Sequence, residues 1–252
     1  MKTRIVGIMG AMPEEIEGVV SLITNCKVLT AGMRTYYSGR INETEVVVVF
    51  SRWGKVAAAT TVSTLIHEFH ITELIFTGVA GAIASKLKIG DVVIGDQLIQ
   101  HDMDAQPLME RFEIPLLNKT YFEGNQSLSD LASKAIHQIF DSKQLHTIIG
   151  NEELSSFGIT HPQLYFGEIA SGDQFFSGSE QKTNLTNALP DVLCVEMEGA
   201  AVAQVCYEHE IPFVIIRTIS DAADEQSHID FPAFIRKISS KYSVAIIKNM
   251  LA

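Results

Sequence analysis

Short runs of apolar residues recur along the chain, and most of them end in a small or polar loop that is followed by a helical pattern. The runs are continuous rather than alternating in polarity, as in RIVGIMG at 4–10, VVVVFS at 46–51, ELIFTG at 73–78, DVVIGDQLIQHD at 91–102, YFGEIASG at 165–172 and FVIIRTI at 213–219. Strands buried on both faces have this composition, and strands separated by helices form a largely parallel sheet that is covered on both faces. The pattern therefore predicts the α/β class.

Helical patterns follow several of these runs, at 11–23, 55–69, 127–142 and 179–189. The first contains Pro13, which suits the first turn of a helix, and Glu14 and Glu15, whose charges favour the positive end of the helix dipole. A fifth segment, VAGAIASKLKIG at 79–90, follows ELIFTG and is expected to continue the alternation of strand and helix. The unpatterned stretches at 101–126 and 151–165 are predicted to be surface loops.

The composition indicates one globular domain, 1–252, that acts on a small molecule. The chain has 252 residues, of which 46% are hydrophobic, and no Pro/Gly/Ser-rich linker divides it. Its formal net charge of -11 argues against nucleic acid and against an anionic membrane surface, because both are bound through basic side chains. No apolar window reaches the ~18 residues of a membrane helix. The three cysteines, Cys26, Cys194 and Cys206, lack metal-site spacing and are typical of a reducing cytoplasm.

Several acidic residues follow predicted strands. In open α/β sheets the ligand lies beyond the carboxyl ends of the strands, and Glu15, Asp102, Asp104, Asp173 and Asp221 follow such ends. We therefore expect these widely separated acids to converge on one pocket.

The stretch CVEMEGAAVAQVCYEHEIPFVIIRTISDAADEQSH, at 194–228, places Glu196 and Glu198 against an apolar segment and Asp221 after an apolar strand. Cleavage of a ribose–purine bond has an oxocarbenium-like transition state. It requires an acid for the base, a carboxylate that activates water, and acceptors for the ribose hydroxyls. A carboxyl group that acts as an acid near neutral pH needs a raised pKa, which partial burial provides. Asp221 is the natural candidate for this acid.

Each candidate also has a purely structural interpretation. Glu15 suits the first turn of a helix, Asp221 a helix cap, and Glu198 the N-terminus of the helix GAAVAQVC. The acids of HDMD at 101–104 are more typical of loop fixation than of a metal site, because no second cluster has ligand spacing. Other candidates are core residues by default, namely Met12, Met197, Phe175, Phe176 and Phe231.

A set of motifs resembles, in order and spacing, the bacterial 5′-methylthioadenosine/S-adenosylhomocysteine nucleosidases of the nucleoside phosphorylase superfamily. The motifs are GIMGAMPEEIEGV, GKVAAA, TGVAGAI, HDMDA, SGDQFFSG, VEMEGAAVAQVC and IRTISDAADEQSH, and the resemblance runs from about residue 4 to 250. It implies an α/β three-layer sandwich with a twisted mixed β-sheet flanked by helices, and a homodimer. It also implies irreversible hydrolysis that releases adenine without a metal or an organic cofactor.

The resemblance implies a role for each motif residue. Glu15 resembles the carboxylate that activates water, Asp221 the acid that protonates adenine N7, and Glu198 the acceptor for the ribose hydroxyls. Arg217 resembles an arginine near these hydroxyls, whose charge would help to keep Glu198 ionised. The implied substrate-binding residues are Met12, Ala80, Gly81, Phe175, Phe176, Met197, Arg217, Ser220 and Phe231, with Ser220 orienting Asp221 and Phe175 stacking on adenine.

The chain departs from the family pattern around the 5′ substituent. Leu108 and Glu110 stand where bulky apolar or aromatic residues are common, Trp53 and Val79 replace a small aliphatic residue and a serine, and 151–165 resembles an insertion. The leading hypothesis is hydrolysis of methylthioadenosine and S-adenosylhomocysteine. The alternatives are the same hydrolysis of 6-amino-6-deoxyfutalosine, a purine nucleoside phosphorylase, and a non-catalytic nucleoside-binding or storage protein. The phosphorylase is disfavoured because GAMPEEIEGV offers two acids and no arginine where phosphate would bind.

Overall fold

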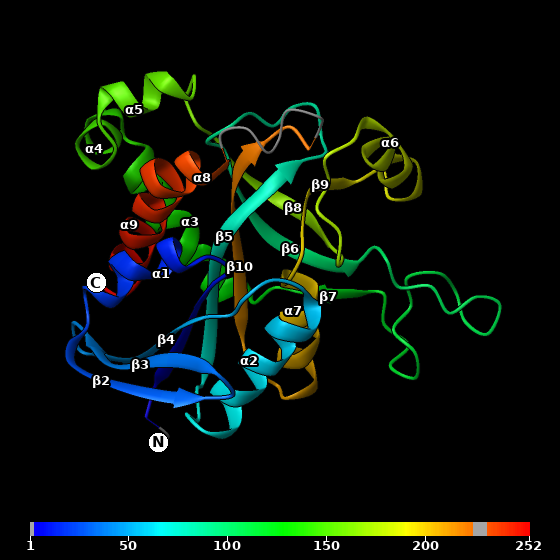
Figure 1. Ribbon diagram of the computed structural model, residues 1–252, viewed down its shortest axis with the longest axis horizontal. Coiled ribbons are helices and arrows are strands. Elements are labelled where there is room, and N and C mark those ends of the chain that lie inside the picture. Colours follow the sequence, from blue (N-terminus) through cyan, green and yellow to red (C-terminus); the bar gives the residue numbers. More distant parts are fainter. Residues whose placement is uncertain (1–2, 224–230) are drawn as a thin grey trace.

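The computed structural model describes residues 3–223 and 231–252 and has a mixed β-sheet at its centre, with helices on both faces (Figure 1). The strands are β1 (Ile5–Gly10), β2 (Thr24–Ala31), β3 (Arg34–Ile41), β4 (Thr44–Phe50), β5 (Glu73–Ala82), β6 (Val92–Gln100), β7 (Tyr121–Glu123), β8 (Leu164–Ser171), β9 (Val192–Glu196) and β10 (Phe213–Asp221). The helices are α1 (Pro13–Val20), α2 (Lys55–His67), α3 (Gln126–Phe140), α4 (Ser142–Ile148), α5 (Asn151–Ser156), α6 (Ser179–Ala188), α7 (Gly199–Glu208), α8 (Phe231–Phe234) and α9 (Ser240–Met250), with a π-helical turn, Ile235–Ser239, between the last two. The predicted α/β architecture, a mixed sheet flanked by helices, is confirmed.

The continuous apolar strands serve two hydrophobic cores, one on each face of the sheet. Successive side chains of a strand point to opposite faces, so a strand buried on both faces must be apolar throughout. In β4, Val46 and Val48 join the core under α1, α3 and α9, whereas Val47 and Val49 join the core under α2 and α7. The same division holds for β1 and β10.

The strand order across the sheet is β10-β6-β8-β9-β5-β1-β4-β3-β2, and β7 pairs with β6. Because β10 also pairs with β5, the strands β5, β9, β8, β6 and β10 close on themselves, and the rest of the sheet extends from β5. The expectation of a largely parallel sheet is wrong in part. The pairs β1–β4, β1–β5, β5–β10, β6–β8 and β8–β9 are parallel. The pairs β5–β9, β6–β10, β6–β7, β2–β3 and β3–β4 are antiparallel.

Two segments differ from the sequence prediction. The stretch after ELIFTG does not begin a helix: residues 79–82 continue β5, because β10 offers main-chain partners on one side, with Val79 opposite Thr218 and Ala80 opposite Ile219. The 151–165 stretch is partly helical, since α5 occupies its beginning. The 101–126 stretch is mostly loop, as predicted, with the short β7 inside it. In the part of the chain that is described, no helix is long and apolar enough to cross a membrane.

Candidate active site

A cavity of about 300 Å³ lies at the carboxyl ends of β1, β5, β9 and β10. Every catalytic or substrate-binding residue that the family resemblance implies lines it, except Glu15 and Arg217. The lining consists of Ala11, Met12, Trp53, Val79, Ala80, Gly81, Gln174, Phe175, Phe176, Val195, Glu196, Met197, Glu198, Ser220, Asp221 and Phe231. The sheet thus brings segments from the whole length of the chain to one edge, as expected for an α/β ligand site.

Asp221 occupies the last position of β10, where the pairing with β5 shifts register after Ile219. A bulge of this kind re-aims the side chain that follows it. Ser220 donates a hydrogen bond to Oδ2 of Asp221 at 2.7 Å, and the amide of Ala223 donates to Oδ1 at 2.8 Å. Glycine at position 81 leaves room for this carboxyl group, because a Cβ there would stand 3.0 Å from Oδ1. The side chain therefore has one orientation at the pocket wall.

Glu15 is fully buried in the first turn of α1, behind the part of the pocket wall formed by Ala11 and Met12. Its Oε2 accepts hydrogen bonds from the amides of Ala11 at 2.8 Å and Met12 at 2.9 Å. This is how a glutamate caps a helix, so the structural interpretation of Glu15 also holds. Burial raises the pKa of Glu15 to about 7, although the charge of Arg217 and these amides lower it. The carboxyl group thus titrates close to neutral pH.

Glu198 is the residue immediately before α7, and its carboxyl group is buried in the pocket wall. Its Oε1 accepts a hydrogen bond from the amide of Gly54 at 2.8 Å. Burial, together with the neighbouring charge of Glu196, raises the pKa of Glu198 to about 8. A buried carboxyl group with a single main-chain donor retains free acceptor positions, which suits the recognition of hydroxyl groups.

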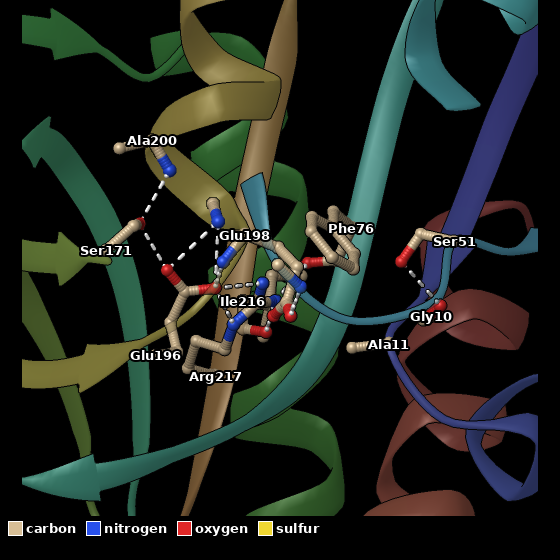
Figure 2. A network of polar contacts seen from close by, with 12 residues as sticks. Gly10, Ala11, Ser51, Phe76, Ser171, Glu196, Glu198, Ala200, Ile216 and Arg217 are labelled. Atoms are coloured by element: carbon tan, nitrogen blue, oxygen red, sulfur yellow. Dashed lines mark hydrogen bonds and ion pairs between the residues drawn. The ribbon is translucent and has the colours of Figure 1, made fainter. Parts of the chain in front are cut away.

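Behind Glu198, the carboxylate of Glu196 is the centre of a buried polar network (Figure 2). Arg217 forms an ion pair with Oε2 of Glu196 through Nη2 at 2.7 Å and Nε at 3.2 Å. The amides of Glu198 and Gly199 and the hydroxyl of Ser171 donate to the same carboxylate. Glu196 therefore caps the start of α7 and holds the backbone of Glu198 in place.

The structure places Arg217 behind the pocket wall, next to Glu196, whereas the resemblance implies a place near the ribose hydroxyls. Arg217 is fully buried, does not line the pocket, and has its guanidinium 4.1 Å from the centre of the Phe76 ring. Its charge does favour the ionised form of Glu198, but burial and Glu196 outweigh it, so the pKa of Glu198 is raised rather than held low. Arg217 lies away from the pocket because its guanidinium forms an ion pair with Glu196, a partner that the sequence alone did not identify.

Replacement of Arg217 by methionine is expected to lower the free energy of unfolding by about 3–5 kcal/mol, because it leaves Glu196 buried without its counter-charge. Urea denaturation of the purified variant measures this change. Arg4→Met is the matched control, since Arg4 forms an ion pair of similar length, 2.6 Å, with Glu73 but is partly exposed; such pairs contribute about 0–1 kcal/mol. Equal losses in the two variants would contradict the importance of the buried pair.

The apolar wall of the pocket includes an aromatic pair and a tryptophan. Phe175 packs edge-on against Phe231 with ring centres 6.0 Å apart, and Phe176 is buried. Trp53 also lines the cavity, with its indole Nε1 3.0 Å from Sδ of Met12. The sequence comparison with the family placed Trp53 near the 5′ substituent only as a departure from the family pattern. Trp53 lies between the end of β4 and GKVAAA, and β4 is next to β1, the strand that precedes Met12. This position at the same edge of the sheet is the sequence feature that predicts a place for Trp53 in the pocket lining.

The other acids expected at the pocket lie elsewhere. Asp102 and Asp173 meet at Lys55, outside the cavity lining, and fix loops, as the structural interpretation of HDMD predicts. Asp104 is exposed and accepts from the amide of Gln106 at 3.0 Å. Within residues 3–223 and 231–252, no group of three or more His, Cys, Asp or Glu side chains is arranged to hold a metal ion. The later part of the motif IRTISDAADEQSH, residues 224–228, lies outside the described residues.

The arrangement has the parts that cleavage of a glycosidic bond requires. Asp221 is a held carboxyl group at the pocket surface, Glu15 is a carboxyl group that titrates near neutrality, and Glu198 is an acceptor for hydroxyl groups. The aromatic and aliphatic lining of the remainder of the cavity suits a flat base.

Comparison with known proteins agrees with this chemistry. A family model described as the phosphorylase superfamily matches residues 5–252. A 5′-methylthioadenosine/S-adenosylhomocysteine nucleosidase of Staphylococcus aureus is 33% identical over 249 residues, 98% of this chain and 100% of that protein.

Solved structures are similar over almost the whole chain. The nucleosidase of the same name from Neisseria meningitidis, in complex with methylthio-immucillin-A, is 32% identical with a TM-score of 0.86, and the match covers 98% of each chain. The futalosine hydrolase of Helicobacter pylori strain 26695 is 32% identical with a TM-score of 0.84, covering 99% of this chain and 97% of that one. This chain therefore belongs to the phosphorylase superfamily and, within it, to the 5′-methylthioadenosine/S-adenosylhomocysteine nucleosidase family.

Proposed function

We propose that this protein is an N-ribosyl hydrolase that cleaves 5′-methylthioadenosine and S-adenosylhomocysteine, releasing adenine and the 5-thioribose product. The position of Glu15 carries the proposal. Its carboxylate accepts hydrogen bonds from the amides that follow β1, the place where a phosphorylase would hold phosphate. A buried carboxylate repels phosphate and accepts a proton from water, so the nucleophile is water.

The reaction follows from three carboxyl groups. As the bond between C1′ and the purine nitrogen breaks, Asp221 transfers its proton to N7 of adenine, which leaves as the neutral base. Glu15 takes a proton from the attacking water, whose oxygen bonds to C1′. Glu198 accepts hydrogen bonds from the ribose hydroxyls, and these bonds strengthen as positive charge develops on the sugar. At the end the proton lost by Asp221 is balanced by the one gained by Glu15.

The character of the pocket wall supports a purine nucleoside with an uncharged 5′ substituent near the ring. Met12, Trp53, Phe175 and Phe231 form an apolar surface, and the ionisable lining residues within 3–223 and 231–252 are acidic. The relatives from Staphylococcus aureus and Neisseria meningitidis are named for methylthioadenosine and S-adenosylhomocysteine, which carry a thioether at this position.

Adenine release from methylthioadenosine in phosphate-free buffer tests the proposal. Release whose rate is unchanged by added phosphate is the expected result. A rate that depends on phosphate, with a 5-thioribose 1-phosphate as the product, would instead indicate a phosphorylase. Binding of the nucleoside without any release of adenine would indicate a storage or binding protein.

A second candidate is hydrolysis of 6-amino-6-deoxyfutalosine, favoured by the similarity to the Helicobacter pylori futalosine hydrolase. Its aromatic carboxylate would approach a pocket whose ionisable lining residues, among those that the structure describes, are Glu196, Glu198 and Asp221, which are all acidic. We therefore expect the methylthioadenosine reaction to have the higher kcat/KM when the two substrates compete in one mixture. The reverse order would assign the futalosine reaction.

The pH dependence of the reaction is expected to follow Glu15. A base must be ionised, and the pKa of Glu15 is raised to about 7, so kcat/KM should fall as the pH decreases through this value. Below about pH 6 the loss should approach tenfold per pH unit. Because Glu198 lies nearby with a pKa raised to about 8, the apparent value belongs to both groups. Initial rates measured from pH 5 to 9 check this, and a flat profile down to pH 5 would contradict the role of Glu15.

We also propose a cytoplasmic homodimer. Trp53, which precedes α2, and Val56, in its first turn, are 62% and 78% exposed, which supports a partner on this surface. Light scattering coupled to size-exclusion chromatography measures the mass in solution, and a mass of one chain would contradict the dimer.

A further inference from the structure

Three charged residues from separate elements form a closed ring of contacts beside the pocket. Lys55, the first residue of α2, has its Nζ 2.6 Å from Oδ1 of Asp102, which follows β6. The other oxygen of Asp102 accepts from the amide of Asp173, in the loop after β8, at 2.9 Å. Oδ1 of Asp173 accepts from the amide of Lys55 at 2.8 Å, which closes the ring.

Two links connect this ring to the pocket. The first is Gly54, whose amide precedes that of Lys55 and donates to Oε1 of Glu198 at 2.8 Å. Gly54 has φ +88, and a Cβ there would stand 2.9 Å from Oδ1 of Asp173, so the tight approach requires glycine. Of these two adjacent amides, that of Gly54 therefore donates to a carboxylate of the pocket, Glu198, and that of Lys55 donates to a carboxylate of the ring, Asp173.

The second link is the loop that begins at Asp173. The next three residues, Gln174, Phe175 and Phe176, line the cavity. The loop is held at its start by the bond from the amide of Asp173 to Asp102. The ring therefore joins the wall that faces the base to the carboxyl group that faces the ribose.

We propose that Lys55, Asp102 and Asp173 are positioning residues that set the relative places of Glu198 and of the Phe175–Phe176 wall. The inference rests on the proposed hydrolase function. None of the three lines the pocket, so they act through Gly54 and through the loop after Asp173. Asp102 contacts both other members of the ring, because one of its oxygens binds Lys55 and the other accepts from the amide of Asp173.

The ring also bears on the ionisation of Glu198. Burial raises the pKa of Glu198 most, and the charges of Glu196 and Glu15 raise it further, whereas the amide of Gly54 and the charge of Arg217 lower it. Loosening Gly54 removes one of the two interactions that favour the ionised form. The pKa of Glu198 should then rise further, an effect that a purely structural ion pair would not produce.

The test compares Lys55→Met, Lys55→Arg and Asp102→Asn with wild type. We expect Lys55→Met and Asp102→Asn to lower kcat/KM for methylthioadenosine roughly tenfold, since small misplacements of binding groups have large effects on rate. The acidic limb of the kcat/KM profile should move to higher pH by roughly half a unit. Lys55→Arg retains the charge and should recover part of the loss. The double variant Lys55→Met/Asp102→Asn should lose no more than either single variant, because both open the same ring.

Arg4→Met is again the control, since it removes the ion pair between Arg4 and Glu73. This pair has the same length as that between Lys55 and Asp102 and includes no residue of the ring. A fall in melting temperature for Lys55→Met, with unchanged kcat/KM and an unchanged pH profile, would reduce the ring to a structural ion pair and overturn the proposal. Additive losses in the double variant would also overturn it.

A binding measurement separates this proposal from the proposed function. Trp53 is the only tryptophan in the chain and lines the pocket, so its fluorescence reports on occupancy. Adenine titrated into wild type and Lys55→Met gives dissociation constants that do not depend on turnover. If wild type fails to hydrolyse any nucleoside, the proposed function fails, and the ring is judged by adenine alone. Weaker binding by several fold in Lys55→Met supports the ring, and equal binding overturns it.

Discussion

Replacement of Asp221 by asparagine is expected to lower kcat for adenine release about 10³-fold with little change in KM. An amide cannot transfer a proton to N7, and general acid catalysis contributes about 10²–10⁴-fold. Asparagine retains an oxygen for the amide of Ala223, which donates to Oδ1 in the wild type, so the shape of the site should persist. Single-turnover rates with methylthioadenosine measure the chemical step without product release.

A substrate with an activated leaving group isolates the role of the acid. A 5-thioribosyl compound that releases 4-nitrophenolate needs no protonation, so Asp221→Asn should cleave it nearly as fast as wild type. An equal loss on both substrates would show that Asp221 does not act as the acid. Trp53 fluorescence on addition of adenine serves as the control that the variant still binds the base.

Replacement of Glu15 by glutamine is expected to reduce kcat about 10³-fold on both substrates, because each requires an activated water. Glutamine keeps an oxygen that accepts from the amides of Ala11 and Met12, so the cap of α1 should remain. Quantification of adenine by absorbance after rapid quench measures the loss. Full turnover by this variant would remove Glu15 from the mechanism.

Thermal unfolding provides the control for Glu15→Gln, because the pKa of Glu15 fixes the direction of the expected change in melting temperature. The pKa of Glu15 is raised from 4.5 when unfolded to about 7 when folded, so its contribution to stability is complete below pH 4.5 and is lost as the pH rises through 7. The variant should therefore gain melting temperature relative to wild type at pH 8, by roughly 5 °C, and lose this advantage at pH 4.5. A folded, more stable and inactive variant separates catalysis from stability.

Much of the fold was predictable from local pattern. The strands β1, β4 and β10 are continuous apolar runs because each supplies side chains to two cores, and the helix 126–140 follows from the periodicity of its apolar residues. The exception at 79–82 has a tertiary cause. This segment of small residues has no strong preference for helix or strand, and its pairing with β10 makes it continue β5.

The sequence by itself determined which acids are available and where strands end. Asp221 lines the pocket as its strand-end position predicted, whereas Asp102, Asp104 and Asp173, predicted on the same ground, do not. Only the tertiary structure decided how the charges pair. Arg217 binds Glu196 because β9 and β10 place those side chains together, and Lys55 meets Asp102 and Asp173 across three elements. Titration near neutrality in Glu15 likewise depends on burial by residues distant in the chain. Local pattern specifies periodicity and element ends, whereas the partners and solvation of a charge depend on which distant segments pack beside it.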